Sequence, residues 1–318
     1  MELLGNNIFN YVLPTDILLR CPRCRADLDV DFCFTCGFYP RVRDGIVYAL
    51  PPERAEYYAR FIADYERIRA AEGRGSENES FYLGFPYVDL SGRNHKQWQI
   101  RARSYECLMD NVLKPSLPSG GGRILDLGAG NGWMSYRLAM AGHHPFAIDL
   151  LVNRSDGLGA AEHYRRHLPG LFPRFCAEIA HLPFQSDQFD AAIFNASFHY
   201  AEDYEASLRE AIRCVRVGGV VIISDTPWYS SEKSGARMVS ERHAFFLQRY
   251  GTASDAIRSA EYLTDARLHE LQDQLSIRWT AYTPDYGFYW TMRPIIAKLR
   301  RRREPSRFRI YAARKLAS

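Results

Sequence analysis

The segment from Arg123 to Gly132 narrows the choice of fold more than any other part of this chain. It reads Arg-Ile-Leu-Asp-Leu-Gly-Ala-Gly-Asn-Gly, an apolar strand that runs directly into a glycine-rich loop. A side chain at Gly128 or Gly130 would keep the backbone from turning tightly and from approaching a ligand closely. A strand, such a loop and then a helix, predicted here over 133–141, are typical of the ligand-binding edge of a parallel sheet. The segment therefore predicts an α/β fold with helices on both faces of the sheet.

The loop by itself does not name the ligand. The unpaired N–H groups and the partial positive charge at a helix N-terminus suit a carboxylate and a phosphate equally well. A dinucleotide fingerprint has its third glycine at the sixth position, where this chain has Trp133. Asp126 would repel a pyrophosphate, whereas it would attract an amino group. NAD and FAD are therefore the less favoured ligands.

A second acidic residue lies where a ribose-binding residue is expected. The next predicted strand, 145–148, ends in Asp149, which follows Gly128 by 21 residues. In dinucleotide-binding folds the acidic residue that binds the ribose lies about 20 residues further on. A solvated strand end or a helix cap is the alternative interpretation of Asp149.

Residues 120–230 resemble the class I S-adenosyl-L-methionine (SAM)-dependent methyltransferases, in particular the type 11-like group of small-molecule enzymes that includes the quinone-biosynthesis methyltransferases. Residues 125–132 match the first motif of that family, and 147–150 match its acidic second strand end. The run Glu178-Ile-Ala-His-Leu-Pro-Phe, followed by Phe189-Asp190, is similar to a third segment, in which the family usually has Asp in place of Glu178. Arg216-Val-Gly-Gly resembles the turn into the fifth strand.

The resemblance implies a Rossmann-like class I methyltransferase sheet, SAM as the cofactor and methyl transfer as the reaction. It implies that Asp126 holds the methionine amino group indirectly, that the loop passes under the cofactor and that Asp149 clasps the ribose hydroxyls. Glu178 would accept a hydrogen bond from the adenine amino group. The cofactor-binding residues implied in this way are Asp126, Gly128, Ala129, Gly130, Asn131, Gly132, Asp149, Leu150, Glu178, Ile179 and Asn195.

Two Cys-x2-Cys pairs lie near the start of the chain, with eight residues between them. Four thiolates that converge on one ion at tetrahedral geometry suit zinc. Disulfides or free thiols are the alternative. The spacing favours a structural zinc ribbon without an open coordination position, so no catalysis by the metal is expected. The predicted ligands are Cys21, Cys24, Cys33 and Cys36.

The residues that flank these cysteines help to decide between a zinc site and disulfides. Met1 to Leu13 has an early Glu2, no basic start and no long apolar core, so it does not read as a signal peptide. A cytoplasmic location is therefore expected, where disulfides are rare. With its flanks, especially 39–46, the segment resembles the small zinc-domain activator that partners tRNA, ribosomal RNA and release-factor methyltransferases.

The chain of 318 residues has room for a small module and a larger domain. We predict a zinc-ribbon domain at 1–51, a helical linker or lid at 52–118, in which Pro52 begins a helix that Gly73 ends, and a methyltransferase domain at 119–318. Its helical insertion at 231–280 is expected to contain helices over 232–250 and 253–275, followed by an apolar strand region and a last strand at 308–312. The apolar runs are too short to span a bilayer, so no transmembrane segment is expected.

One histidine follows the fourth predicted strand. The strand over 190–195 leads to His199, whose ordinary pKa range suits a general base. Packing or loop anchoring is the alternative role. Asp225, at the end of the fifth strand, would face the same pocket or form a turn before Pro227. The segment Asn195-Ala-Ser-Phe lacks both prolines of the Asn-Pro-Pro-Tyr motif typical of methyltransferases that modify adenine or glutamine amino groups.

Three functions stay open on these grounds. The leading one is methyl transfer to a small-molecule or lipid-like acceptor, because the aromatic insertion favours a sizeable, partly apolar one. The second is an RNA methyltransferase, in which the ribbon aids recognition and the basic run over 298–303 neutralises phosphates, although a solvated hairpin would show the same run. The third is a regulator or methyltransferase activator that binds SAM and transfers nothing. The oligomeric state is not predicted.

Overall fold

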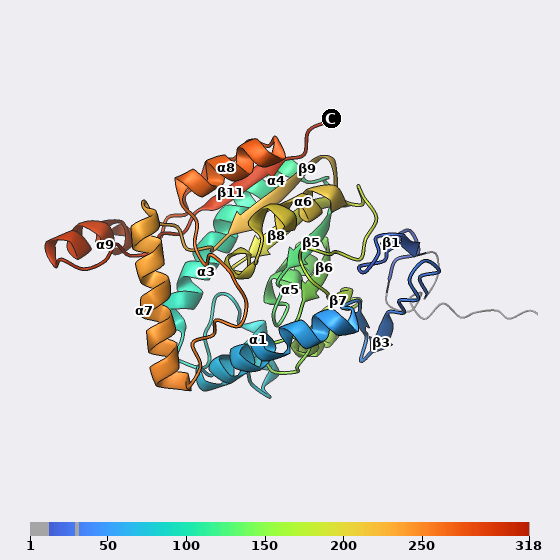
Figure 1. Ribbon diagram of the computed structural model, residues 1–318, viewed down its shortest axis with the longest axis horizontal. Helices are drawn as coiled ribbons and strands as arrows, with labels where there is room; N and C mark the ends of the chain where they lie inside the picture. Colours follow the sequence, from blue (N-terminus) through green and yellow to red (C-terminus); the bar gives the residue numbers. More distant parts are fainter. Residues whose placement is uncertain (1–12, 29–31, 318) are drawn as a thin grey trace, which may run out of the picture.

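A nine-stranded mixed sheet forms the centre of the molecule (Figure 1). The structure, a computed structural model, describes residues 13–28 and 32–317. Across the sheet the strands lie in the order β10-β11-β9-β8-β5-β6-β7-β4-β3. Their bounds are β3 Arg41–Arg43, β4 Ile46–Tyr48, β5 Arg123–Leu127, β6 His144–Asp149, β7 Arg174–Cys176, β8 Phe189–Asn195, β9 Val215–Ser224, β10 Thr280–Tyr282 and β11 Ile310–Arg314.

Strands β4 to β9 run parallel to one another, and the strand order reverses beside β5. The strands predicted at the glycine-rich loop and after it are confirmed as β5, β6, β8 and β9. Both faces of β5 are buried, which is why Ile124, Leu125 and Leu127 form an apolar run rather than an alternating pattern. Ligands of such sheets bind at the carboxyl ends of the strands beside the reversal.

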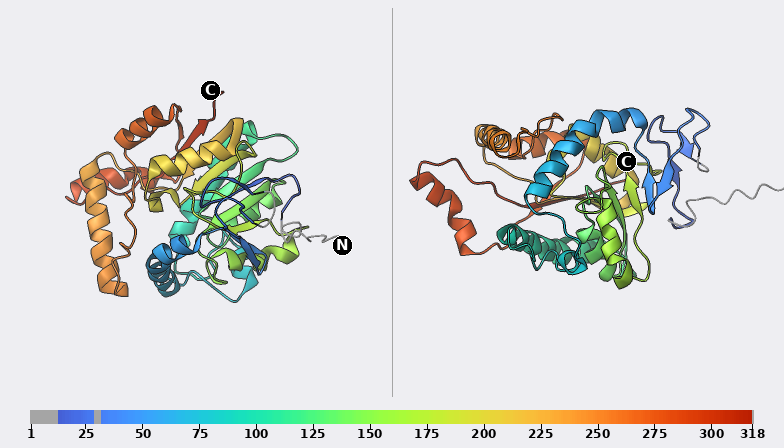
Figure 2. Two further views of the ribbon diagram at one scale, coloured as in Figure 1. Left: turned by 45° about the vertical axis from the view of Figure 1, so that its right-hand side comes forward. Right: turned by 90° about the horizontal axis from the view of Figure 1, so that it is seen from below.

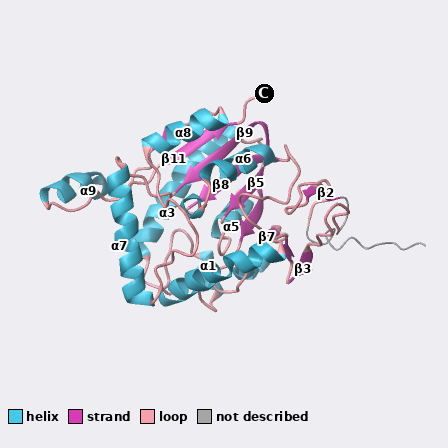
Figure 3. Ribbon diagram, in the orientation of Figure 1, coloured by secondary structure: helices cyan, strands magenta, loops and turns pink. Residues whose placement is uncertain are grey.

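Helices cover both faces of the sheet, as predicted (Figure 3). On one face, Leu208 of α6 (Tyr204–Cys214) and Leu268 of α8 (Asp265–Leu275) share a core with Phe194. On the other face, α3 (His95–Leu108) and α5 (Trp133–Met140) pack on Ile124. The remaining short helices are α2 Glu79–Leu83, η2 Met109–Leu113, α4 Lys114–Ser116, η3 Leu158–His167 and η4 Phe198–Tyr200.

The cysteine-containing segment packs directly on the main sheet. Its strands β1 (Leu19–Arg20) and β2 (Asp27–Leu28) form a small antiparallel sheet, and Leu19 also bridges to Phe184. Strand β4 pairs in parallel with β7, so the hairpin β3-β4 extends the nine-stranded sheet. Buried Leu28, Cys33 and Phe38 belong to the same core as Phe184. The first 51 residues, expected as a domain of their own, therefore share a core with the rest of the chain as far as the structure describes them. The prediction that Met1 to Leu13 is not a signal peptide concerns a segment of which the structure describes only Leu13.

Helix α1 (Pro52–Ala71) crosses beside the carboxyl edge of the sheet (Figure 2). It confirms the predicted helix of the linker or lid, with Pro52 in its first turn and Gly73 just beyond its end. Its buried Tyr58 and Phe61 pack against Ile257, which lies in the segment before α8. The helix is therefore held in part by a segment that is distant from it in the sequence.

The insertion differs from the prediction in one helix. Helix α7 (Glu232–Tyr250) is confirmed, with Gly251 in the left-handed region after it. The helix expected over 253–275 begins only at Asp265, as α8, where the Thr264 hydroxyl caps it. Ser254 and Glu261 have positive φ angles of 56° and 64°, which a right-handed helix does not allow.

The region expected as strand before the last strand contains β10 (Thr280–Tyr282) but is otherwise not strand. Helix α9 (Phe288–Leu299) lies there and projects from the body of the molecule (Figures 1 and 2). Aromatic residues such as Tyr289 and Trp290 favour strands, but Gly287 begins a helix, since its carbonyl accepts the N–H of Trp290 at 3.1 Å. None of the helices in the described ranges has the length and apolarity needed to cross a bilayer.

Candidate functional site

A cavity of about 350 Å³ opens at the carboxyl ends of β5, β6 and β8. This volume is within the usual range for small-molecule sites. Gly132 is the one predicted cofactor residue that does not line it, because it begins α5 with a φ of 75° and lies against Phe172. The predicted residues that do line the cavity are Asp126, Gly128, Ala129, Gly130, Asn131, Asp149, Leu150, Glu178, Ile179 and Asn195.

The glycine-rich loop is drawn against the end of β6. The N–H groups of Gly128 and Ala129 both donate to the Ile148 carbonyl, at 2.8 and 2.9 Å. Gly128 has a φ of 78°, and a Cβ there would lie 2.3 Å from the Cβ of Ser197. Only glycine therefore allows the loop to lie this close to the loop after β8.

Two buried carboxylates stand in the cavity wall. Asp126 accepts hydrogen bonds from the Ser135 backbone N–H and hydroxyl at 3.1 and 2.7 Å, and burial raises its pKa to about 7. Asp149 accepts from the N–H groups of Gly130 and Leu151 at 2.7 and 2.8 Å, and burial raises its pKa to about 6. A cation bound beside them would favour both ionised forms, because it would offset the cost of burial.

Glu178 joins the cavity wall to helix α1. Arg54 donates to both of its carboxylate oxygens, each at 2.8 Å, and the Tyr58 hydroxyl donates at 3.0 Å. Burial acts to raise the pKa of Glu178, but His181, whose Nδ1 atom lies 3.4 Å from the carboxylate, and the two hydrogen bonds from Arg54 lower it to about 2. The carboxylate is therefore ionised at neutral pH and holds the first turn of α1 over the cavity.

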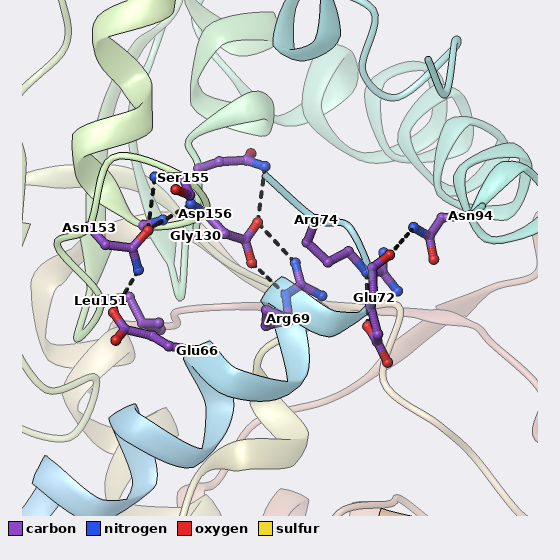
Figure 4. Close-up of polar contacts among 12 residues, drawn as sticks. Glu66, Arg69, Glu72, Arg74, Asn94, Gly130, Leu151, Asn153, Ser155 and Asp156 are labelled. Atoms are coloured by element: carbon purple, nitrogen blue, oxygen red, sulfur yellow. Dashed lines mark hydrogen bonds and ion pairs between the residues drawn. The ribbon is translucent and has the colours of Figure 1, made fainter. Parts of the chain in front are cut away.

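A second ion pair holds the last turn of α1 (Figure 4). Arg69 donates through Nε and Nη2 to Asp156, the latter bond being 3.1 Å long. The Asp156 Oδ1 atom also lies 3.4 Å from the Asn131 side-chain amide of the glycine-rich loop. The helix and the loop are thus joined through one buried carboxylate.

The sequence analysis did not identify Arg54, Arg69 or Asp156 as site residues. Helical spacing offers a clue for the arginines, because positions 54, 58, 61, 65 and 69 lie on one side of a helix and all line the cavity. Arg54 and Arg69 are the polar residues at the two ends of this otherwise aromatic stripe, and they lie at the rim of the cavity. No comparable local pattern marks Asp156.

A second cavity, of about 230 Å³, adjoins the first. His199 lines this cavity and not the first one, and burial together with Arg242 and Arg101 lowers its pKa to about 3. Its ring is therefore neutral at pH 7. Asp225 lines the same cavity and accepts a hydrogen bond from the Ser104 hydroxyl, and burial raises its pKa to about 6. The residues that line both cavities are Tyr65, Arg69, Arg101, Ala196 and Tyr200.

The four predicted zinc ligands lie together. The Sγ atoms of Cys21, Cys24, Cys33 and Cys36 are all within 4.8 Å of one another, with the pairs Cys21–Cys36 and Cys24–Cys33 at 3.6 and 3.4 Å. Tetrahedral zinc with Zn–S bonds of 2.3 Å would place its sulfur ligands about 3.8 Å apart. The donor set and its spacing therefore fit a zinc ion.

The backbone at each cysteine pair explains why the sulfur atoms converge. Arg25 and Gly37 have positive φ angles of 66° and 71°. Their N–H groups turn back to the carbonyls of Cys21 and Cys33, at 2.9 and 2.8 Å. Each pair thus forms a tight knuckle that points both thiols to the same side.

Comparison with known proteins identifies the central part of the chain. Residues 125–223 match the family described as "Methyltransferase domain". The chain is 29% identical over 136 residues to a malonyl-[acyl-carrier protein] O-methyltransferase of Erwinia pyrifoliae, which covers 42% of this chain and 48% of the relative. It is 34% identical over 138 residues to a demethylmenaquinone methyltransferase of Clavibacter sepedonicus, with 43% and 50% covered. The chain thus spans about half the length of these curated relatives.

A solved structure is similar over a larger share of the chain. It is the 1,6-didemethyltoxoflavin-N1-methyltransferase of Burkholderia thailandensis, with 18% identity, a TM-score of 0.47, and 88% of this chain and 95% of that chain covered. The matched family region, 125–223, begins within β5, ends within β9 and contains the glycine-rich loop, Asp126, Asp149 and Glu178. The chain therefore carries a methyltransferase domain with the Rossmann-like sheet of the class I type.

Proposed function

We propose that this protein is a SAM-dependent methyltransferase and that its acceptor is a small or lipid-like molecule. The observation that supports this most is the cavity at the carboxyl edge of the sheet, where Asp126, Asp149 and Glu178 surround the glycine-rich loop. SAM carries an ammonium group, ribose hydroxyls and an adenine amino group that match these three carboxylates. Two relatives of the matched region are named for malonyl-[acyl-carrier protein] and demethylmenaquinone rather than for RNA.

In this proposal SAM supplies a methyl group that is already activated, so the protein has mainly to bind, align and shield. The first cavity binds the cofactor through the predicted residues, while Arg54 and Arg69 hold α1 over it and exclude water. The second cavity receives the acceptor. Where the acceptor loses a proton, Asp225 is better suited to take it than His199, because its pKa of about 6 lies nearer to neutral pH than about 3. A catalytic role for His199 stays a prediction.

The pH dependence of cofactor binding tests the two buried acids. We expect the affinity for SAM to rise as the pH is raised from 5 to 7.5, because the carboxyls of Asp149 and Asp126, with pKa values near 6 and 7, become anionic over this range and then attract the cationic ligand. Isothermal titration at each pH measures the effect. The variant Asp126→Asn should lose the upper part of the rise, and an affinity that is flat over the whole range would contradict the assignment.

A labelling experiment tests the reaction itself. Purified protein is incubated with methyl-labelled SAM and an extract of its own cells, and the label is counted separately in RNA, protein, organic-soluble and small-molecule fractions. We expect label in the organic-soluble or small-molecule fraction, above a control with heat-denatured protein. Label in RNA would instead favour the alternative function and would draw attention to exposed Arg300, Arg301 and Arg302 after α9. Binding of SAM without any transfer would support the regulator.

We also propose that zinc is bound by the four cysteines and that its role is structural. All four thiols converge, so a tetrahedral ion there would have no free position for a substrate. The segment touches the methyltransferase domain along β4 and around Leu19. An ion at this place would therefore support the sheet and the start of α1 rather than take part in the chemistry.

A further inference from the structure

Several arginines line the second cavity. Four arginines line it, against the two carboxylates of Glu72 and Asp225. Arginine presents a planar fork of N–H groups that matches carboxylate and phosphate oxygens. The arginines are Arg69, Arg74, Arg101 and Arg242.

Two of these arginines have strong partners within the protein. Arg69 is paired with Asp156, and Arg242 lies 2.6 Å from a carboxylate oxygen of Glu261. The positive charges of Arg69 and Arg242 are therefore largely neutralised within the protein. These two ion pairs stabilise the wall of the cavity rather than bind a ligand.

Arg74 is only partly satisfied. Its Nε atom donates to Glu72 at 3.0 Å and its Nη2 atom donates to Gln97, as Figure 4 shows for Glu72. The side chain is only 7% exposed, yet its Nη1 atom has no hydrogen-bond partner among the described residues. A buried guanidinium N–H without a partner is costly, so a polar ligand is expected there.

Arg101 lacks an ion pair among residues 13–28 and 32–317. Its guanidinium lies 4.9 Å from the ring centre of Trp98 and lines both cavities. Burial, together with the nearby charges of Arg74 and Arg69, lowers its pKa to about 10, while the nearby Asp225 carboxylate acts in the opposite direction. A half-buried cation that lies near two others is stabilised most simply by an anion.

We propose that the second cavity binds the methyl acceptor through an oxyanion group, a carboxylate or a phosphate, held by Arg101 and Arg74. This inference rests on the proposed function, because it names the acceptor of that reaction. A cavity of about 230 Å³ admits a small acceptor, or the polar head of a larger one. The carboxylate of Asp225, whose Oδ2 atom has no partner in the described part of the chain, lines the same space.

In this proposal Asp225, Arg101 and Arg74 have separate roles in the methyl transfer. The lone pair of an acceptor oxygen or nitrogen forms the new bond to the methyl carbon, while the bond between carbon and sulfur breaks and its electron pair stays on sulfur. An acceptor heteroatom that carries a proton passes it to Asp225. The oxyanion on Arg101 and Arg74 orients the acceptor and takes no part in the bond changes.

Titration of the whole 318-residue chain with succinate and with inorganic phosphate, at constant ionic strength, tests the proposal. We expect one of the two anions to bind, and the variant Arg101→Gln to weaken that binding by about tenfold or more. Arg101→Lys should keep part of it. The matched control is Arg103→Gln, an exposed arginine two residues along the same helix. Should Arg101→Gln fail to fold, Arg74→Gln takes its place.

Each outcome decides one point. Binding of succinate alone would assign a carboxylate acceptor, and binding of phosphate alone a phosphorylated one. If neither anion binds while SAM does, or if Arg103→Gln weakens binding as much as Arg101→Gln, the inference is wrong and the proposed function stands. If SAM does not bind to the folded wild-type protein, the proposed function itself is wrong.

Discussion

Replacing Asp149 by alanine is expected to weaken SAM binding by about hundredfold or more, because the hydrogen bonds that this buried carboxylate is proposed to accept from the ribose hydroxyls would be lost. The same change removes the acceptor that holds the Gly130 N–H at 2.7 Å, so the glycine-rich loop loses its brace as well. Isothermal titration with SAM measures the change. Circular dichroism and the melting temperature establish that the variant is folded.

The matched control is Asp110→Ala. Asp110 is an exposed aspartate whose only side-chain partner in the described part of the chain is Lys114. We expect the dissociation constant of the Asp110→Ala variant for SAM to equal that of the wild type. An unchanged dissociation constant in Asp149→Ala would mean that this carboxylate is a helix cap or strand end and does not bind the ribose.

Loss of the proposed zinc ion is expected to have the second large effect. We expect Cys33→Ser to lower the zinc content well below one ion per chain and to lower the melting temperature by many degrees, because structural zinc sites stabilise their small folds by about 10 kcal/mol or more. The damage should extend beyond the ribbon. Cys33 and Phe38 share a core with Phe184, and β4 is paired with β7, so unfolding of the ribbon exposes the edge of the main sheet.

The effect should also reach the cofactor cavity. Arg23, between the first two cysteines, donates to both carboxylate oxygens of Glu53 in the first turn of α1, each at 2.7 Å. Loss of the knuckle should therefore loosen α1 and weaken SAM binding. The control is Cys107→Ser, a cysteine outside the cluster. A Cys33→Ser protein without zinc that melts and binds SAM like the wild type would show that the metal is not structural.

Features that depend on residues close together in the sequence were predictable. Strand β5, the glycine-rich loop, helix α5 and the end of β6 with Asp149 form one local unit, and the cysteine knuckles form another. The helix predicted over 253–275 is confirmed only over 265–275 and the strand region only at β10, for a related reason. Their composition was consistent with the predicted state, but positive φ angles at Ser254 and Glu261 and the start of a helix after Gly287 overrode it.

What the sequence by itself determined is the ligand-binding edge of a parallel sheet and the two cysteine knuckles whose four thiols converge, because turn chemistry, strand patterning and cysteine spacing are encoded over a few residues. Only the tertiary structure decided how α1 is held, since Arg54 meets Glu178 across 124 positions and Arg69 meets Asp156 across 87. It also decided that the cysteine segment shares the core of the main sheet and that arginines from separate elements meet in the second cavity. No periodic pattern or fixed spacing in the sequence predicts such contacts, because they form between residues that only the packing of the whole sheet brings together.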